Sequence, residues 1–192
     1  MNYLAHAYCS FRDPPVVVGN MISDFIKGKK QFEFPEAIQK GIRLHRLIDS
    51  YTDAHPAVKE AKTVFRPVYR LYSGAFVDVS FDYFIANDPE IFKEESDLKA
   101  FSGFVYDCMD TWTAWLPEAT RLYFFRMKEQ DWLFNYRLIW GMEKSFGGVV
   151  YRSAYLNDAA PALQIFKENL DFLKSCYQQF MPDLQKVVAG YE

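Results

Sequence analysis

Apolar side chains recur along this chain at intervals of three and four residues, and prolines and glycines divide it into blocks of helical length. Such spacing places the apolar residues on one face of a helix. We predict helices over residues 14–28, 35–51, 57–65, 75–86, 98–115, 117–127, 131–141, 142–155 and 159–180. No sustained alternation of apolar and polar residues supports a strand, so we predict an all-α, single-domain helical bundle without a sheet.

The composition favours one folded domain over residues 1–192. Half of the residues are hydrophobic and 18% are aromatic, which argues against disorder. The net charge of −3 gives no positive field for nucleic acid, and three cysteines fit neither a disulfide framework nor a zinc knuckle. We see no signal peptide and no apolar run of the ~20 residues that a membrane span needs. We therefore expect a cytoplasmic protein that binds neither nucleic acid nor membrane, and the sequence leaves its oligomeric state open.

His45 and Asp49 are the first of several polar residues on helix faces that are otherwise apolar. They are four residues apart, so they project from one face about one turn apart. A carboxylate that faces a core costs free energy unless a partner or a metal ion compensates its charge. The same spacing also occurs in exposed ion pairs on helix surfaces, and the pattern alone leaves both interpretations open.

Asp78 and Asp82 repeat this spacing among the apolar residues of the helix predicted over 75–86. They are candidates for the same kind of polar site within the bundle. A structural explanation is equally open, because Arg66 or Arg70 could neutralise either carboxylate.

His6 and Asp24 each interrupt a short apolar stretch. Taken alone, a histidine such as His6 is more often a satisfied core residue than a metal ligand. Asp24 is likewise explained by a helix cap or by an ion pair with Lys27. Asp53 and His55 lie in a predicted turn, where aspartate is common.

Together, these residues make a stronger pattern than any one of them. Carboxylates from separate helices repel one another unless a cation joins them, and bundle cores are a known place for divalent metal sites. The chain has only three histidines, so we expect a site made mostly of carboxylate oxygen. Oxygen ligands favour Mn²⁺ or Mg²⁺ over zinc.

Five segments of the first half carry a resemblance to a known family. They are Asn2–His6, Gly19–Phe25, Gly41–Asp49, Thr52–Pro56 and Val77–Asp82. In this order they resemble the acyl carrier protein phosphodiesterases, also called acyl carrier protein hydrolyases. The second half fits in length and helical character, so the resemblance covers the whole chain.

The resemblance implies an HD-phosphohydrolase-like helical fold and a Mn²⁺-dependent reaction. Its substrate would be holo-acyl carrier protein, and its products apo-acyl carrier protein and free 4′-phosphopantetheine. One position departs from the family pattern, which usually has a histidine where this chain has Tyr83. Tyrosine is a poor Mn²⁺ ligand, so either that histidine is dispensable or the site is altered.

On this basis we assign roles to individual residues. The candidate metal ligands are His6, Asp24, His45, Asp49 and Asp82. The candidate catalytic residues are Asp24, His45, Asp49, Asp78 and Arg46. In this hypothesis the metal activates a water that attacks phosphorus, and a cation such as Arg46 or Lys27 offsets the developing phosphoryl charge.

Carrier proteins are acidic, so we expect basic residues near the site to bind the partner. The candidates are Lys27, Lys29, Lys30, Lys40 and Arg43. The same charges are also explained by a solvated surface and by the negative end of a helix dipole.

Two other functions stay open at this point. One is an HD-like phosphohydrolase that acts on a nucleotide, and the other is a non-catalytic carrier-binding protein with a degraded metal site. The aromatic residues between 124 and 140 suit the core, and a few could line a channel for the pantetheine arm.

Overall fold

In a computed structural model, which describes residues 1–191, all regular structure is helical and no strand occurs in that range. The α-helices are α1 (Tyr3–Tyr8), α2 (Pro14–Ile22), α3 (Glu36–Ala54), α4 (Pro56–Tyr69), α5 (Ser73–Ala86), α6 (Glu95–Thr111), α7 (Glu118–Glu129), α8 (Trp132–Asn135), α9 (Ile139–Arg152), α10 (Ala160–Glu168) and α11 (Leu170–Ala189). Short 3₁₀ segments are η1 (Ser23–Phe25), η2 (Gly28–Glu33), η3 (Arg70–Tyr72) and η4 (Thr113–Trp115). The predicted all-α class is confirmed.

Two helices continue through a proline and beyond their predicted ends at residues 65 and 180. Helix α4 passes Pro67 and ends at Tyr69, and α11 passes Pro182 and ends at Ala189. A proline inside a helix costs roughly 3 kcal/mol. Both helices bury apolar side chains beyond the proline, such as Tyr69 and Leu184, and this packing outweighs the cost.

Other predicted bounds were wrong for local reasons. The helix predicted over 14–28 ends at Ile22 and gives way to η1 and η2. The helix predicted over 159–180 is two helices, separated at Asn169, whose side chain donates to the carbonyl of Ile165. Helix α1 was not predicted, since six residues are too few for a periodic pattern.

Helices α2 and α3 are in unusually close contact, and two glycines permit it. A Cβ atom on Gly19 would lie 2.0 Å from the carbonyl oxygen of Ile38, and one on Gly41 would lie 2.2 Å from that of Val16. The backbones therefore touch directly at this crossing. It fixes the position of Asn20 on α2 relative to the inward face of α3.

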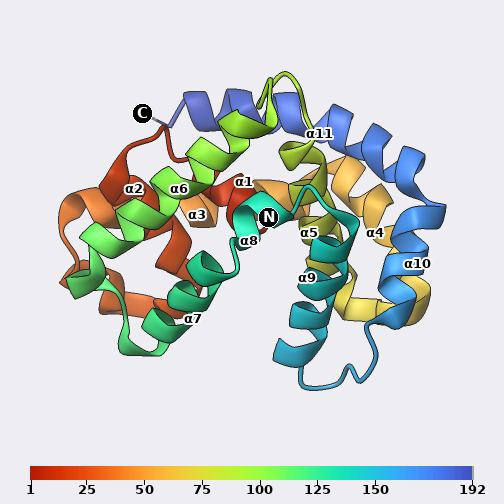
Figure 1. Cartoon of the computed structure of the whole chain (residues 1–192), viewed down its shortest axis with the longest axis horizontal. Helices are drawn as coiled ribbons and strands as arrows, with labels where there is room; N and C mark the ends of the chain where they lie inside the picture. The colour runs from red at the N-terminus through yellow and green to blue at the C-terminus, as the bar shows by residue number, and fades with distance from the viewer. Residues whose placement is uncertain (192) are drawn as a thin grey trace.

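The helices pack around α1, which contacts both α2 and α5 near the middle of the molecule (Figure 1). Helix α11 runs along one side and contacts α3, α4 and α5. Buried apolar residues form a continuous cluster. The assignment of residues 1–192 to a single domain stays a prediction.

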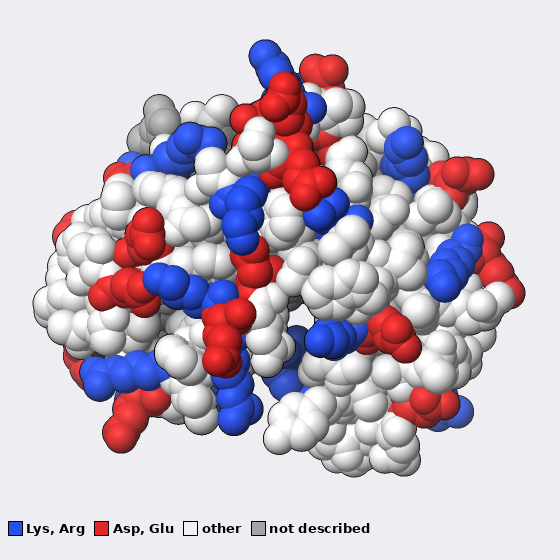
Figure 2. All heavy atoms as spheres, viewed as in Figure 1, with Lys and Arg blue, Asp and Glu red and all other residues white. Residues whose placement is uncertain are grey.

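On the face shown in Figure 2, acidic and basic side chains are interspersed. Within the described residues, no helix has the length and hydropathy of a membrane span.

Candidate metal centre

Helix α3 carries His45 and Asp49 on the side that faces the protein interior. The His45 ring is 6% exposed, and its Nδ1 donates to the backbone oxygen of Asn20 at 2.8 Å. That hydrogen bond turns Nε2 toward two carboxylates, at 3.1 Å from Asp49 Oδ2 and 3.1 Å from Asp24 Oδ1. His45 is therefore buried, whereas the side chains of Asp49 and Asp24 are 41% and 64% exposed, so the group lies at the edge of the interior. Sequence reasoning gave Asn20 no role, although it stands in one of the family segments.

His6 reaches the same carboxylate from α1. Its ring stacks on the His45 ring with 3.9 Å between centroids, and its Nε2 lies 3.1 Å from Asp49 Oδ1. Among the described residues, neither ring nitrogen of His6 has a hydrogen-bond partner of good geometry. Buried polar atoms normally have partners, so an unpartnered imidazole beside a carboxylate indicates a place for a ligand.

His6, His45 and Asp49 can each offer one ligand atom, and these atoms lie within 4.8 Å of one another. Such a group of two imidazoles and a carboxylate fits a divalent transition metal. Asp24 lies 3.1 Å from His45 and adds a second carboxylate to the group. The four residues then offer two imidazole nitrogens and two carboxylates. The site is therefore richer in imidazole than the mostly carboxylate site that we expected.

The electrostatics of the group separate its two histidines. Burial disfavours a charge on His45, but the hydrogen bonds with Asp24 and Asp49 outweigh this and raise its pKa to about 9. Burial and the neighbouring His45 lower the pKa of His6 to about 4. Burial opposes ionisation of Asp49, yet its contacts with His45 and His6 hold its pKa well below the usual range. The hydrogen bond from His45 lowers the pKa of Asp24.

Asp82 lies apart from this group and caps a helix. Its two oxygens accept the backbone N–H groups of Leu4 at 2.8 Å and Ala5 at 3.0 Å, at the start of α1. A carboxylate at a helix N-terminus satisfies unpaired donors and interacts favourably with the dipole. Burial raises the pKa of Asp82 to about 7 despite these two donors. The predicted ligand Asp82 thus has a structural partner instead.

Asp78 faces the site, but its observed partner is the α-amino group of Met1. That nitrogen lies 3.4 Å from Asp78 Oδ1 and 3.2 Å from Asp49 Oδ1. Burial lowers the pKa of the amine, whereas Asp78 and Asp49 raise it more strongly, to about 10. The Met1 amine and the His45 ring thus lie against carboxylates for which we predicted a metal. Burial raises the pKa of Asp78.

A cavity of about 270 Å³ opens onto the site, and its wall includes Arg152 on α9 as well as Met1. Besides the histidines it is lined by Asp24, Asp78 and Tyr3. The guanidinium of Arg46 is turned elsewhere, since it donates to the side chain of Gln31 and to the backbone oxygen of Ile26. Arg152 was not among the predicted site residues, because it lies more than a hundred residues from His6 and His45 in the sequence.

The predicted carrier-binding residues do not all occupy equivalent positions. Lys27, Lys29 and Lys30 are exposed in or beside η2, which follows Asp24 along the chain. Arg43 is exposed on α3 but pairs with Glu36 at 2.6 Å. Lys40 is half-buried on the same helix. The three lysines are thus exposed and follow Asp24 along the chain, whereas Arg43, two residues before His45, already has an acidic partner.

Comparison with known proteins agrees with this arrangement of motifs. The family model described as acyl carrier protein phosphodiesterase matches residues 1–184. This chain belongs to that family. An acyl carrier protein phosphodiesterase of Enterobacter sp. (strain 638) is 29% identical over 186 residues, which cover 95% of this chain and 94% of the relative. One of Escherichia coli O6:H1 is 26% identical over 97% of this chain and 96% of its own, and one of Yersinia pestis is 42% identical over 45% of each. No solved structure matches the chain.

The departure from the acyl carrier protein phosphodiesterase pattern at Tyr83 falls outside the metal centre. The Tyr83 ring packs against Phe84 and Phe166, with ring centroids 5.5 and 5.2 Å away. It is absent from the lining of the cavity at the site. The turn residues Asp53 and His55 are also structural: Asp53 pairs with Lys62, and His55 accepts a hydrogen bond at the start of α4.

Proposed function

We propose that this chain is a metal-dependent phosphodiesterase that releases 4′-phosphopantetheine from holo-acyl carrier protein and leaves apo-acyl carrier protein. Its relatives are named acyl carrier protein phosphodiesterases, which are phosphoric diester hydrolases. The observation that carries the metal dependence is the convergence of His6, His45 and Asp49. We propose Mn²⁺ as the ion, with Mg²⁺ as a substitute.

In this proposal His6, His45 and Asp49 hold the ion, which supplies Lewis acidity toward the phosphodiester and toward the attacking water. The hydrogen bond with His45 lowers the pKa of Asp24, so its carboxylate is ionised near neutral pH and could accept a hydrogen bond from a water at the ion. Arg152, which lines the same cavity as His6 and His45, would bind a phosphoryl oxygen.

We further propose that acyl carrier protein docks beside this cavity. Lys27, Lys29 and Lys30 present three exposed positive charges next to Asp24 in the sequence. An acidic partner would be steered to them by long-range attraction, and salt would weaken that attraction.

The test starts from protein stripped of metal and then loaded with Mn²⁺, Mg²⁺, Zn²⁺ or Fe²⁺. Holo-acyl carrier protein is incubated with each form, and mass spectrometry follows loss of the arm, with a nucleotide panel run alongside. We expect turnover to be highest with Mn²⁺ and absent without metal. Hydrolysis of nucleotides alone would favour the nucleotide alternative, and no turnover with any ion would favour a non-catalytic protein.

Two substitutions test which residues hold the metal ion. His45→Ala and Asp49→Ala should each lower Mn²⁺ affinity by at least about 100-fold and abolish turnover, because each removes a ligand. The matched control is His55→Asn, which changes the third histidine and keeps a residue able to cap α4. Wild-type turnover in both ligand variants would rule out this assignment.

A further inference from the structure

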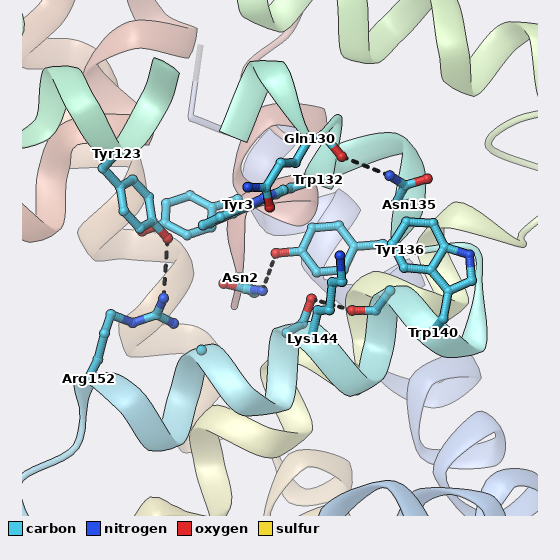
Figure 3. Close-up of a pocket in the computed structure, with 13 residues that line it drawn as sticks. Asn2, Tyr3, Tyr123, Gln130, Trp132, Asn135, Tyr136, Trp140, Lys144 and Arg152 are labelled. Atoms are coloured by element: carbon cyan, nitrogen blue, oxygen red, sulfur yellow. Dashed lines mark hydrogen bonds between the residues drawn. The ribbon is translucent and has the colours of Figure 1, made fainter. Parts of the chain in front are cut away.

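A second and larger cavity, of about 520 Å³, adjoins the metal centre. It is walled by residues of α7, α8 and α9, together with the start of the chain (Figure 3). Asn2, Tyr3 and Arg152 line both this cavity and the one at the metal centre. The two spaces therefore meet at these three residues. In Figure 2 the molecule is hollowed between the regions of α7 and α9.

The walls of the larger cavity are aromatic. Tyr123, Trp132, Tyr136 and Trp140 all contribute side chains. Trp140 is 46% exposed, although it is among the largest apolar side chains in the chain. Partly exposed aromatic walls around a volume of this size are typical of a pocket that takes a small organic ligand.

The polar groups of the cavity suit an amide-containing chain with a phosphate at one end. The side-chain amides of Asn2, Gln130 and Asn135 line it, and amides both donate and accept hydrogen bonds. Its charged lining residues among those described are Lys144 and Arg152, and no carboxylate is among them. Arg152 stands at the junction with the metal centre, where a phosphate would have to sit to be cleaved.

We infer that this cavity binds the pantetheine arm of the substrate, with the phosphate at Arg152 and the rest of the arm extending along the aromatic walls away from the metal centre. The inference rests on the proposed function. In Figure 3, Arg152 lies at one end of the cavity and Trp140 at the other, with Asn2 and Tyr136 between them. Asn2 donates to the Tyr136 hydroxyl at 2.7 Å, which fixes an amide in the middle of the path.

Neighbouring glycines of α9 provide a matched pair of variants. Gly148 lines the cavity, whereas Gly147 does not, and a Cβ on Gly147 would meet nothing within 4 Å. Leucine in place of either glycine improves helix propensity by a similar amount. Gly148→Leu should fill the cavity, and Gly147→Leu should leave it open.

Trp132 and Trp140 provide a readout other than activity. Metal-free protein is titrated with 4′-phosphopantetheine while tryptophan fluorescence is followed, with inorganic phosphate as the control ligand. We expect binding by the wild type and by Gly147→Leu, and at least about tenfold weaker binding by Gly148→Leu, which corresponds to about 1.4 kcal/mol. Equal binding by the two variants, or no fluorescence change in the wild type, would overturn the inference.

Activity on two substrates separates this inference from the proposed function. Gly148→Leu should lower kcat/KM far more toward holo-acyl carrier protein than toward bis(4-nitrophenyl) phosphate, a diester without the arm; some loss on the small diester is expected, because a Cβ on Gly148 lies 3.5 Å from the guanidinium of Arg152. An equal loss of both activities would place the defect at the metal centre and contradict the inference. The wild type could bind 4′-phosphopantetheine more tightly than Gly148→Leu and yet not cleave holo-acyl carrier protein. That result would support the pocket and contradict the proposed function.

Discussion

At the scale of single residues, His45 joins the parts of the candidate centre, since it bonds to Asn20, Asp24 and Asp49. Its Nδ1 is fixed by the backbone of Asn20, so its Nε2 is the nitrogen left for a metal. Without metal, that nitrogen lies between Asp24 and Asp49, and its pKa of about 9 keeps it protonated at neutral pH. An incoming ion must therefore displace a proton. His6, with a pKa of about 4, is already neutral and has no proton to lose.

This arrangement predicts a pH dependence of metal binding. As pH falls below about 9, the protonated fraction of His45 grows, so the apparent Kd for Mn²⁺ should rise about tenfold per pH unit. Above that pH the affinity should level off. Calorimetric titration at neutral pH, in two buffers that differ in ionisation enthalpy, should show about one proton released per ion. A flat affinity between about pH 6 and about pH 8 would contradict the protonated state of His45.

Tyr83 gives a second prediction at this scale. Its ring packs on Phe166, so a histidine at this position would sit among aromatic rings and not at the metal centre. Tyr83→His should therefore add no Mn²⁺ affinity, and it should destabilise the fold by about 1–3 kcal/mol through an unpaired imidazole. Tyr83→Phe, which keeps the ring contacts, serves as the control. Metal titration and thermal unfolding measure both effects, and tighter Mn²⁺ binding by Tyr83→His would refute this view of the position.

The pattern of the chain predicted that His45 and Asp49 share one face of a helix. In the structure both lie on that face of α3, with His45 buried and Asp49 half-buried. The pattern of the chain could not predict the hydrogen-bond partners of Asp82. That carboxylate accepts the N–H of Leu4, 78 residues earlier in the chain, a contact that only the tertiary fold creates. A buried aspartate on an apolar helix is therefore as consistent with a distant helix cap as with a metal.

At the scale of elements, the crossing of α2 and α3 determines the geometry of the site. The backbones meet at Gly19 and Gly41, and next to that contact Asn20 of α2 receives the hydrogen bond of His45 on α3. The two helices can present Asn20 and His45 to each other only because no side chain separates them. Gly19 and Gly41 thus position His45, the proposed metal ligand, through the contact between the two helices.

Gly41→Ala tests this role. The added methyl would lie 2.2 Å from the carbonyl oxygen of Val16 and 2.8 Å from the nitrogen of Asn20, so the helices must move apart. We expect a loss of about 1–3 kcal/mol of stability, even though alanine favours a helix. Gly103→Ala on α6 is the control, because its Cβ meets nothing within 4 Å, and it should stabilise the protein by up to about 1 kcal/mol. Chemical denaturation compares the two, and similar stabilities would show that the crossing tolerates separation.

The ends of the helices show where tertiary packing overrides local sequence signals. The long amphipathic α3 was predicted within a few residues, because its own pattern contains the information. We predicted ends at residues 65 and 180, yet the buried side chains beyond Pro67 and Pro182 keep α4 and α11 helical. The four-residue α8 depends on contacts with α6, α7 and α9 that no local pattern encodes.

At the scale of the whole molecule, the two cavities and the basic segment suggest how a large substrate is handled. The flexible arm would lie in the aromatic cavity, its phosphate at the metal centre, and the folded carrier protein outside. The segment with Lys27, Lys29 and Lys30 is exposed and follows the site residue Asp24. Binding of the carrier and chemistry on the arm would then depend on different residues and be separable by mutation.

The separation predicts distinct kinetic effects. The double variant Lys29→Glu/Lys30→Glu should raise KM for holo-acyl carrier protein several-fold at low salt and leave kcat unchanged, because surface charges act mainly on association. Hydrolysis of a small diester should not change. Lys174→Glu on α11, away from this segment, is the control for a general change of net charge. Since the Debye length falls to about 3 Å at 1 M salt, the difference between variant and wild type should shrink as salt is added. An unchanged KM at low salt would move the docking surface elsewhere, whereas a fall in kcat would mean that these lysines also influence the metal centre.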